Sequence, residues 1–530
     1  MKKIISLLLT FLMVISFITP AMAADYRDPV INNPLVYVRG AGKNIYENND
    51  ENGKIIYPVE FDIEPVIEAL DVIAIDLAMG MLSDDYSDYV DSVYSVFAPI
   101  FEEVVLGKDG EPKDNSGNGP QDDVPVKSSG FKVWDNNLNY DFRLSLLDTA
   151  DVLKDFIDLV SKNTGRSKVS LLGRCLGTNL IAAYLTKYEE HALSKVSDII
   201  LYVPATDGVD LISKLFSGKL EIQAENLDEF VEYFLESKEL IEDPVLENFV
   251  TVLVEMLNYA KVLGLGTDAL QLLVDRLQGE LIPKLGLASF ASFPSYWSMV
   301  CPEDYDDAKK LMFEGQEEEY AGLIEKIDDY YYNVQLKFNQ RLVSLKEKGM
   351  SVSVIAKYNI PNIPISKESL LLGDFVSSTK QLSYGATCAD HGKVLTQSYI
   401  DSLKDTTYLS PDNKIDASTC LFPNNTWFMK NSLHDFFPDD GNRLIAALIN
   451  SQGKMTVFDN ADWPQFVEYV PVEGQDEGVF VPVEGIEPEE PEKGSGEERF
   501  SIFIRFFTAI LNFMTKLFKG DFKNLFNKGE

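Results

Sequence analysis

Residues Lys168 to Leu185 read KVSLLGRCLGTNLIAAYL. They begin as a short apolar strand, pass through a tight turn bracketed by Gly173 and Gly177, and continue as a helix with apolar residues at helical spacing. Because glycine has no Cβ atom, the strand end and the helix start can pass close together beside the turn. So sharp a strand-to-helix turn presents its central residue, Cys175, in a strained backbone conformation at the edge of a sheet.

The spacing Gly-x-Cys-x-Gly resembles the nucleophile elbow of α/β-hydrolases, with cysteine in place of the usual serine. The alternative is a small buried cysteine in an ordinary strand–loop–helix connection. A second apolar run, Val196 to Pro204, follows the helix, and two such strands joined through a helix form a parallel βαβ unit. The sequence therefore predicts the α/β class, with an α/β-hydrolase fold built on a mostly parallel, doubly wound sheet.

Two segments before the elbow extend the resemblance. An apolar run ending in a glycine loop spans Asn33 to Gly42, and Asp141-Phe142-Arg143 precedes an amphipathic helix over Leu147 to Lys162. Together with the elbow they resemble the lecithin:cholesterol acyltransferase-like family of lipases and acyltransferases, in which an Asp-(Trp/Phe)-Arg segment leads into the helix before the nucleophile strand. The alternative for Asp141 and Arg143 is a surface ion pair of little energetic value. The apolar positions expected on the buried face of the helix are Val152, Phe156, Leu159 and Val160.

The resemblance implies a catalytic triad in the chain order nucleophile, acid, histidine. Cys175 is then the nucleophile, Asp374 the acid after a late strand, and His434 the base after the last apolar run. The backbone N–H groups of Ala41 and Leu176 are expected to form the oxyanion hole. Of the other two histidines, His391 is the main rival for the base, and His191 is expected to be a solvated residue near a helix end. We expect no metal and no cofactor.

Residues 209–348 carry a helical pattern too long for an ordinary connection. They are expected to form a helical cap inserted into a core that spans residues 24–208 and 349–464. A cap would exclude water and shape an apolar pocket. A structural subdomain with no gating role is an equal alternative.

The termini and the composition indicate export. Residues 1–23 read as a secretory signal peptide with an Ala-x-Ala cleavage site, so we expect a secreted, bacterial protein. The formal net charge of −37 disfavours nucleic-acid binding, which needs a basic surface. In an oxidising compartment Cys388 and Cys420 are the most plausible disulfide, which leaves Cys301 as a buried thiol.

The chain ends in two segments of contrasting composition. Residues 465–498 are rich in Pro, Gly and Glu and are expected to be a linker. Residues 499–530 have the pattern of a basic amphipathic helix that could lie on a membrane or cell surface. The alternative is a helix packed on the enzyme itself or on another subunit.

Taken together, these features predict a hydrolase acting on carboxylic esters or thioesters, of lipase, esterase or O-acyltransferase type. A Cys-His-Asp triad would work through an acyl-enzyme intermediate on an ester- or lipid-like substrate. The alternative is a catalytically weak or inactive hydrolase-fold protein that binds lipid or a cell surface, because cysteine replaces serine at the elbow and Arg39 stands where many hydrolases carry histidine.

Overall fold

The computed structural model describes residues 29–42, 44–59, 82–121, 131–221, 267–472 and 478–485, with single residues and short runs between 69 and 80 and at 124, 223, 230 and 233. The predicted signal peptide (1–23) and basic helix (499–530) lie outside the described residues. The chain divides into two units, Met1–Val483 and Glu484–Glu530. The sheet, the helices and the candidate site all belong to the first unit.

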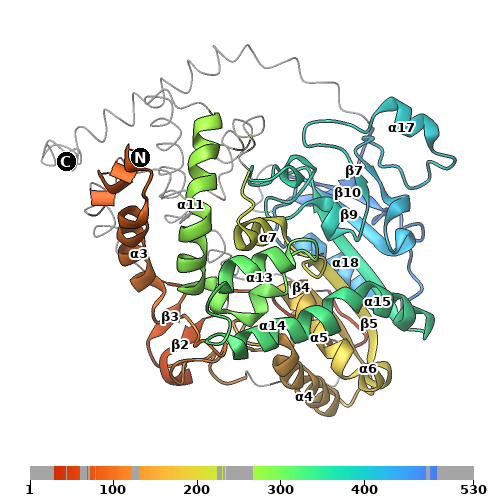
Figure 1. Ribbon diagram of the computed structural model, residues 1–530. Helices are drawn as coiled ribbons and strands as arrows, with labels where there is room; N and C mark the ends of the chain where they lie inside the picture. Colours follow the sequence, from red (N-terminus) through yellow and green to blue (C-terminus); the bar gives the residue numbers. More distant parts are fainter. Residues whose placement is uncertain are drawn as a thin grey trace, which may run out of the picture. The chain divides into compact units, whose positions relative to one another are not determined.

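The first unit is organised around a seven-stranded sheet in the order β1-β4-β5-β6-β9-β10-β11. Strands β4, β5, β9 and β10 of this sheet are labelled in Figure 1. Neighbouring strands run parallel, except that β11 is antiparallel to β10. The strands are β1 (Leu35–Val38), β4 (Val169–Cys175), β5 (Val196–Pro204), β6 (Ser351–Tyr358), β9 (Thr426–Lys430), β10 (Phe466–Val470) and β11 (Val479–Pro482). This is the predicted mostly parallel α/β arrangement, and it is consistent with an α/β-hydrolase-like fold.

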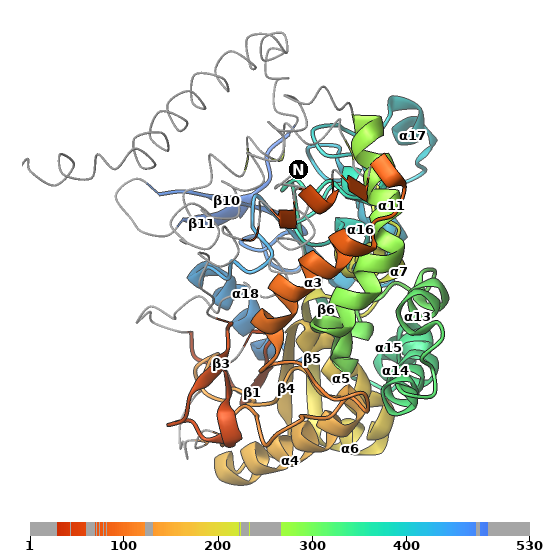
Figure 2. The ribbon, with the colours of Figure 1, turned by 60° about the vertical axis from the view of Figure 1, so that its left-hand side comes forward.

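The central strands are apolar because helices cover both faces of the sheet. Every residue of β4 is buried, and in β5 only Ser197 is partly exposed. In Figure 2, β4 and β5 lie between α18 (Asp439–Asn450) on one side and α5 (Leu176–Lys187) on the other. On the same side as α5 pack α4 (Leu146–Thr164) and α6 (Glu189–Lys195).

Helix α4 begins and ends at residues suited to those positions. The Ser145 hydroxyl caps its first turn by accepting a hydrogen bond from the N–H of Asp148, and Gly165 ends it at φ 66°. Phe156 and Val160 are buried as predicted. The prediction is wrong for Val152 and Leu159, which are exposed, because the buried face is centred on Leu153 and Ile157 instead.

The segment between β5 and β6 contains helices, and its described residues include no strand. Its function as a cap stays a prediction. The helices are α7 (Asp210–Ser217), α11 (Thr267–Leu287), α12 (Pro294–Trp297), α13 (Tyr305–Phe313), α14 (Ala321–Asn333) and α15 (Phe338–Glu347).

The first unit also contains smaller elements outside the seven-stranded sheet. Two short antiparallel pairs form from β2 (Ile45–Tyr46) with β3 (Ile55–Tyr57) and from β7 (Thr387–Cys388) with β8 (Ile415–Asp416). The remaining helices are α3 (Ser87–Phe101), α16 (Thr379–Leu382) and α17 (Gln397–Ser402). Among the described residues, no helix is both long enough and apolar enough to cross a membrane.

The predicted end of the core at residue 464 is wrong, because β10 and β11 extend the sheet beyond it. Phe466 of β10 stacks on Phe428 of β9 with ring centroids 5.1 Å apart. The carboxylate of Glu468 lies 3.4 Å from the ammonium of Lys430. Strands β10 and β11 are only partly buried, so β10 can carry such acidic residues, and the acidic composition of residues 465–498 concealed both strands within the predicted linker.

Candidate active site

Cys175 occupies the strained turn that the elbow pattern predicts. It is the last residue of β4 and the cap of α5, with φ 51° and ψ −127°. Few non-glycine residues adopt a positive φ, and the conformation persists only where surrounding structure holds it. The side chain is 4% exposed.

The two elbow glycines allow close approaches of α5, Gly177 to the end of β1 and Gly173 to the end of β4. A Cβ atom on Gly177 would lie 2.1 Å from the carbonyl oxygen of Val38 and 2.5 Å from that of Arg39. A Cβ on Gly173 would lie 2.8 Å from the Ile181 side chain. A larger residue is excluded at Gly177, because the obstructing atoms belong to the backbone, whereas at Gly173 the Ile181 side chain would have to move and the Cβ would crowd the backbone of Thr178. These close approaches agree with the steric reason given for the glycines in the sequence.

The predicted acid and base meet at the carboxyl ends of neighbouring strands. Asp374 lies in the loop after β6, and His434 follows β9. The Nδ1 atom of His434 is 2.6 Å from Oδ2 of Asp374, and the backbone N–H of His434 donates to the backbone carbonyl of Asp374 at 3.0 Å. Oδ1 of Asp374 accepts hydrogen bonds from the N–H groups of Val376 (3.2 Å) and Ser377 (2.9 Å). The carboxylate is thus held rigidly against the imidazole.

The charge state of His434 depends on both partners. Burial by itself lowers the pKa of His434, but the Asp374 carboxylate and the Cys175 side chain outweigh it and raise the pKa well above its ordinary value. Its Nε2 atom is buried and has no hydrogen-bond partner within the described part of the chain. The Cys175 side chain is therefore close enough to the imidazole to raise the pKa of His434.

The loop after β1 lies directly against the elbow. A Cβ atom on Gly40 would be 3.1 Å from the Cβ and 3.7 Å from the sulfur of Cys175. The hydroxyl of Tyr140 donates to the carbonyl of Arg39 at 2.7 Å and braces this loop. Ala41 follows in the loop, and Leu176 opens α5, where first-turn N–H groups have no partner within the helix. Their use as an oxyanion hole stays a prediction.

The rival histidines have other partners. His191 joins two helices, with Nδ1 2.8 Å from the Tyr184 hydroxyl and Nε2 3.1 Å from Asp158, so it is half-buried rather than solvated. His391 follows β7, and its backbone N–H donates to the carbonyl of Leu370. Of the three histidines in the sequence, His434 is the one bonded to Asp374.

The predicted disulfide between Cys388 and Cys420 is absent, because all four cysteines are free thiols. The pairing of β7 with β8 places Cys388 opposite Ile415, and its sulfur lies 3.6 Å from the carbonyl oxygen of Ala386. Burial raises the pKa of Cys388, and the proximity of Cys420 raises it further. The two thiols are therefore neighbours that are not bonded.

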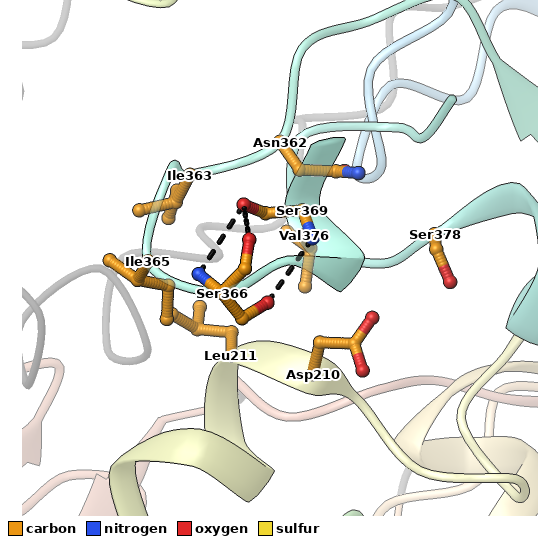
Figure 3. A pocket seen from close by; sticks show the side chains of 9 residues that line it. All are labelled: Asp210, Leu211, Asn362, Ile363, Ile365, Ser366, Ser369, Val376 and Ser378. Carbon is orange, nitrogen blue, oxygen red and sulfur yellow. Dashed lines mark hydrogen bonds between the residues drawn. The ribbon is translucent and has the colours of Figure 1, made fainter. Parts of the chain in front are cut away.

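A small cavity lies on another side of the acid loop (Figure 3). It lies between the start of α7 and the loop after β6 and is partly open to solvent, and its lining residues include Asp210, Leu211, Ile365, Ser366, Ser369 and Val376. Cys175, Asp374 and His434 do not line it. It is therefore not a substrate pocket for the thiol. The described residues also include no cluster of three or more metal-ligating side chains.

Sequence reasoning missed two buried cations near the proposed Cys175, His434 and Asp374 site, namely Lys357 and Arg174. Lys357 interrupts the apolar strand β6, and Arg174 directly precedes Cys175. A charged residue inside a continuous apolar run was the signal that could have identified both, because such a charge is buried only where it has specific partners.

Comparisons with known proteins add little to this geometry. No protein-family model matches the chain, and neither does any curated protein. Among solved structures, the chain is similar to Kex1, a prohormone-processing carboxypeptidase from Saccharomyces cerevisiae, at 12% identity and a TM-score of 0.23, over 65% of this chain and 72% of that one. The likeness is too weak to carry an argument, so a functional assignment has to rest on the strand order and on the arrangement around Cys175.

Proposed function

We propose that this protein is a hydrolase-fold enzyme of the acyl-transfer class that acts on carboxylic esters or thioesters through Cys175, His434 and Asp374. The observation that carries the proposal is the hydrogen bond between His434 and Asp374 beside a cysteine held at a positive φ. A base oriented by a carboxylate, with its second nitrogen unbonded and a thiol close by, is the arrangement that activates a nucleophile.

In the proposed reaction, Nε2 of His434 takes the Cys175 proton and the thiolate attacks the substrate carbonyl carbon. The carbonyl electrons move to oxygen, and the N–H groups of Ala41 and Leu176 stabilise the resulting oxyanion. Collapse of the tetrahedral intermediate breaks the bond to the alcohol or thiol, which leaves with the proton from His434. Water, or an acceptor alcohol, then attacks acyl-Cys175 with His434 as base and releases the acid or the new ester.

The buried carboxylate of Asp374 has two roles in the proposed reaction. Asp374 fixes the tautomer in which Nδ1 carries the proton and Nε2 can accept one. It also stabilises the imidazolium that forms in the first step.

We propose, in addition, that the protein is secreted, as its N-terminal sequence suggests. We also propose that its substrate is ester- or lipid-like, as the family resemblance suggests.

A second candidate is a weak or inactive hydrolase-fold protein that binds lipid or a cell surface. The burial of the site favours it, because Cys175 is 4% and His434 is 2% exposed. An enzyme with this resting state must open before a substrate can reach the thiol, whereas a binding protein need not.

Turnover of p-nitrophenyl esters of graded chain length distinguishes the two. We expect the purified protein to release p-nitrophenol, and Cys175→Ala to abolish release while Cys420→Ala, which removes another buried free thiol, leaves it unchanged. Iodoacetamide should inactivate the wild-type protein by labelling Cys175. Equal, slow labelling of all thiols with no ester turnover would favour the binding protein.

A further inference from the structure

Lys357 is a fully buried lysine whose ammonium is hydrogen-bonded to the histidine loop, which we define as Leu433–Phe436. Its side chain is 0% exposed. The ammonium donates to the carbonyl oxygens of Leu433 (2.5 Å), His434 (3.1 Å) and Phe436. It also lies 5.0 Å from the ring centroid of Tyr202 in β5. The side chain thus reaches from β6 to three of the four carbonyls in the loop that carries His434.

The burial of this ammonium requires an explanation. Moving an unpaired charge out of water is costly, and the neighbouring positions of β6 are apolar. A lysine ammonium has three N–H donors, and here three carbonyl oxygens are arranged to receive them. An apolar side chain would fill the same space without the desolvation cost but would leave these carbonyls unbonded.

Arg174 contacts the same loop from the elbow side. Its guanidinium donates to the side chain of Asp435 at 2.8 Å and to the backbone carbonyl of Asp435 at 3.3 Å. Arg174 directly precedes Cys175, and Asp435 directly follows His434. The ion pair therefore links the two chain segments that must keep the thiol and the imidazole together.

We propose that Lys357 and Arg174 are positioning residues that hold the histidine loop in register with the elbow, and that only the protonated form of Lys357 holds it fully. This inference rests on the proposed function. It assigns to two buried cations, 183 residues apart in sequence, a shared task in placing Nε2 of His434 toward Cys175.

The charges around Lys357 make this positioning sensitive to pH. Burial is the main cause that lowers the pKa of Lys357 to about 7. The carboxylates of Asp374 and Asp435 raise this pKa, and the Arg174 guanidinium lowers it further. A neutral amine has one donor fewer than an ammonium, so one carbonyl loses its hydrogen bond. The loop should therefore loosen as the pH rises through about 7.

Lys357→Met tests the proposal, with Lys430→Met as the matched control. Lys430 is similarly buried at the end of the neighbouring strand β9, but its partners include the carboxylates of Asp412 and Glu468. We expect Lys357→Met to lower kcat by about 100-fold, the usual effect of a small misplacement, with little change in KM. The decline of wild-type kcat above pH 7 should disappear in this variant and persist in Lys430→Met.

The low-field proton resonance of the His434–Asp374 hydrogen bond supplies a readout that needs no turnover. In the wild-type protein it should broaden as the pH rises through 7, and in Lys357→Met it should be weak at every pH. Asp435→Asn changes a partly exposed residue, so it tests the Arg174 contact with little risk to folding; we expect a several-fold loss in kcat with KM unchanged.

The proposal is overturned if Lys357→Met and Asp435→Asn both keep the wild-type proton resonance and the wild-type pH profile of kcat. If the wild-type protein hydrolyses no ester but its resonance depends on Lys357 as described, the proposed function is wrong and the positioning of His434 stands. If it hydrolyses esters and both variants match Lys430→Met, the positioning proposal is wrong and the function stands.

Discussion

At the scale of single residues, the sequence could propose a triad because each of the three residues has a recognisable position in the chain. Glycines bracket Cys175, Asp374 follows a strand, and His434 follows the last strand that the sequence pattern revealed. The structure brings Asp374 and His434 into contact across 60 residues of chain. It could not have been predicted that Lys357 bonds the loop of His434, because the partners of a buried charge are set by tertiary packing.

Asp374→Asn removes the charge that orients His434. The amide can donate to Nδ1 and so favour the tautomer whose Nε2 is protonated and cannot act as a base. It also removes an interaction that raises the pKa of His434. We expect kcat for a p-nitrophenyl ester to fall by about 10²–10⁴-fold, the usual contribution of a general base.

Asp198→Asn is the control for this change. Asp198 is also buried, but it lies near the start of β5 and accepts hydrogen bonds from Ser170 and Ser197. Burial raises its pKa, which means that the site disfavours the charged carboxylate, so a neutral amide should be accommodated there. Equal losses of kcat in the two variants would contradict a specific role for Asp374.

At the scale of elements, the alternative interpretation of Asp141 and Arg143 as a surface ion pair is wrong. Arg143 and Asp141 do not form a surface ion pair; they are buried together before α4. The guanidinium bonds both oxygens of Asp141 (3.0 and 2.7 Å) and also reaches the carbonyl of Val104 and the hydroxyl of Ser116. The pair therefore ties the loop entering α4 to two segments that precede it in the chain.

Arg143→Ala should destabilise the protein by about 3–5 kcal/mol, because it leaves the Asp141 carboxylate buried without its partner. Lys54→Ala, which breaks the exposed pair with Glu103, should cost at most about 1 kcal/mol. Urea unfolding followed by circular dichroism measures both. Similar midpoints for the two variants would show that burial of the Arg143 pair has no energetic weight.

Gly177→Ala tests the close approach of α5 to β1. The added Cβ would meet two backbone carbonyls, which cannot rotate away, so we expect a loss of about 1–3 kcal/mol or more. Gly279→Ala, at a helical glycine with open space around it, should instead stabilise α11 by about 0.5–1 kcal/mol. Thermal unfolding of the two variants should therefore shift in opposite directions.

At the scale of the whole molecule, the parallel sheet was predicted from alternating strands and helices, whereas its margin was not. Strands β10 and β11 were missed because acidic residues within and around them resemble a linker in composition. The positions of the basic residues also differ from what an acidic composition suggests. The chain has 47 basic and 84 acidic residues, yet three of the basic ones, Lys357, Arg174 and Arg143, are buried in the interior.

Stability should depend on pH through the buried carboxyl group of Asp210. Burial, with the Glu368 charge, raises its pKa from 3.8 to about 6, so the folded state holds the proton more tightly than the unfolded state. This contribution is fully present below about pH 3.8 and is lost as the pH rises through about 6. Asp210→Asn should therefore increase the free energy of unfolding at pH 8, by on the order of 2–3 kcal/mol, and by about half as much at pH 5.

Asp405→Asn provides the comparison, because Asp405 is exposed and its hydrogen bonds with Thr407 lower its pKa. It should not stabilise the protein at pH 8. Urea titrations of the wild type and both variants at pH 5 and pH 8 make the comparison. A gain for Asp210→Asn that is the same at both pH values would contradict the assigned cause.

The most direct test of a nucleophilic Cys175 is the mass of the protein during the reaction. Rapid mixing with p-nitrophenyl butyrate, acid quenching and intact mass spectrometry should show one butyryl group per chain, and peptide mapping should place it on Cys175. The adduct should be absent in Cys175→Ala and should accumulate less in Asp374→Asn. An acyl adduct on another residue, or none while ester is being hydrolysed, would contradict Cys175 as the nucleophile.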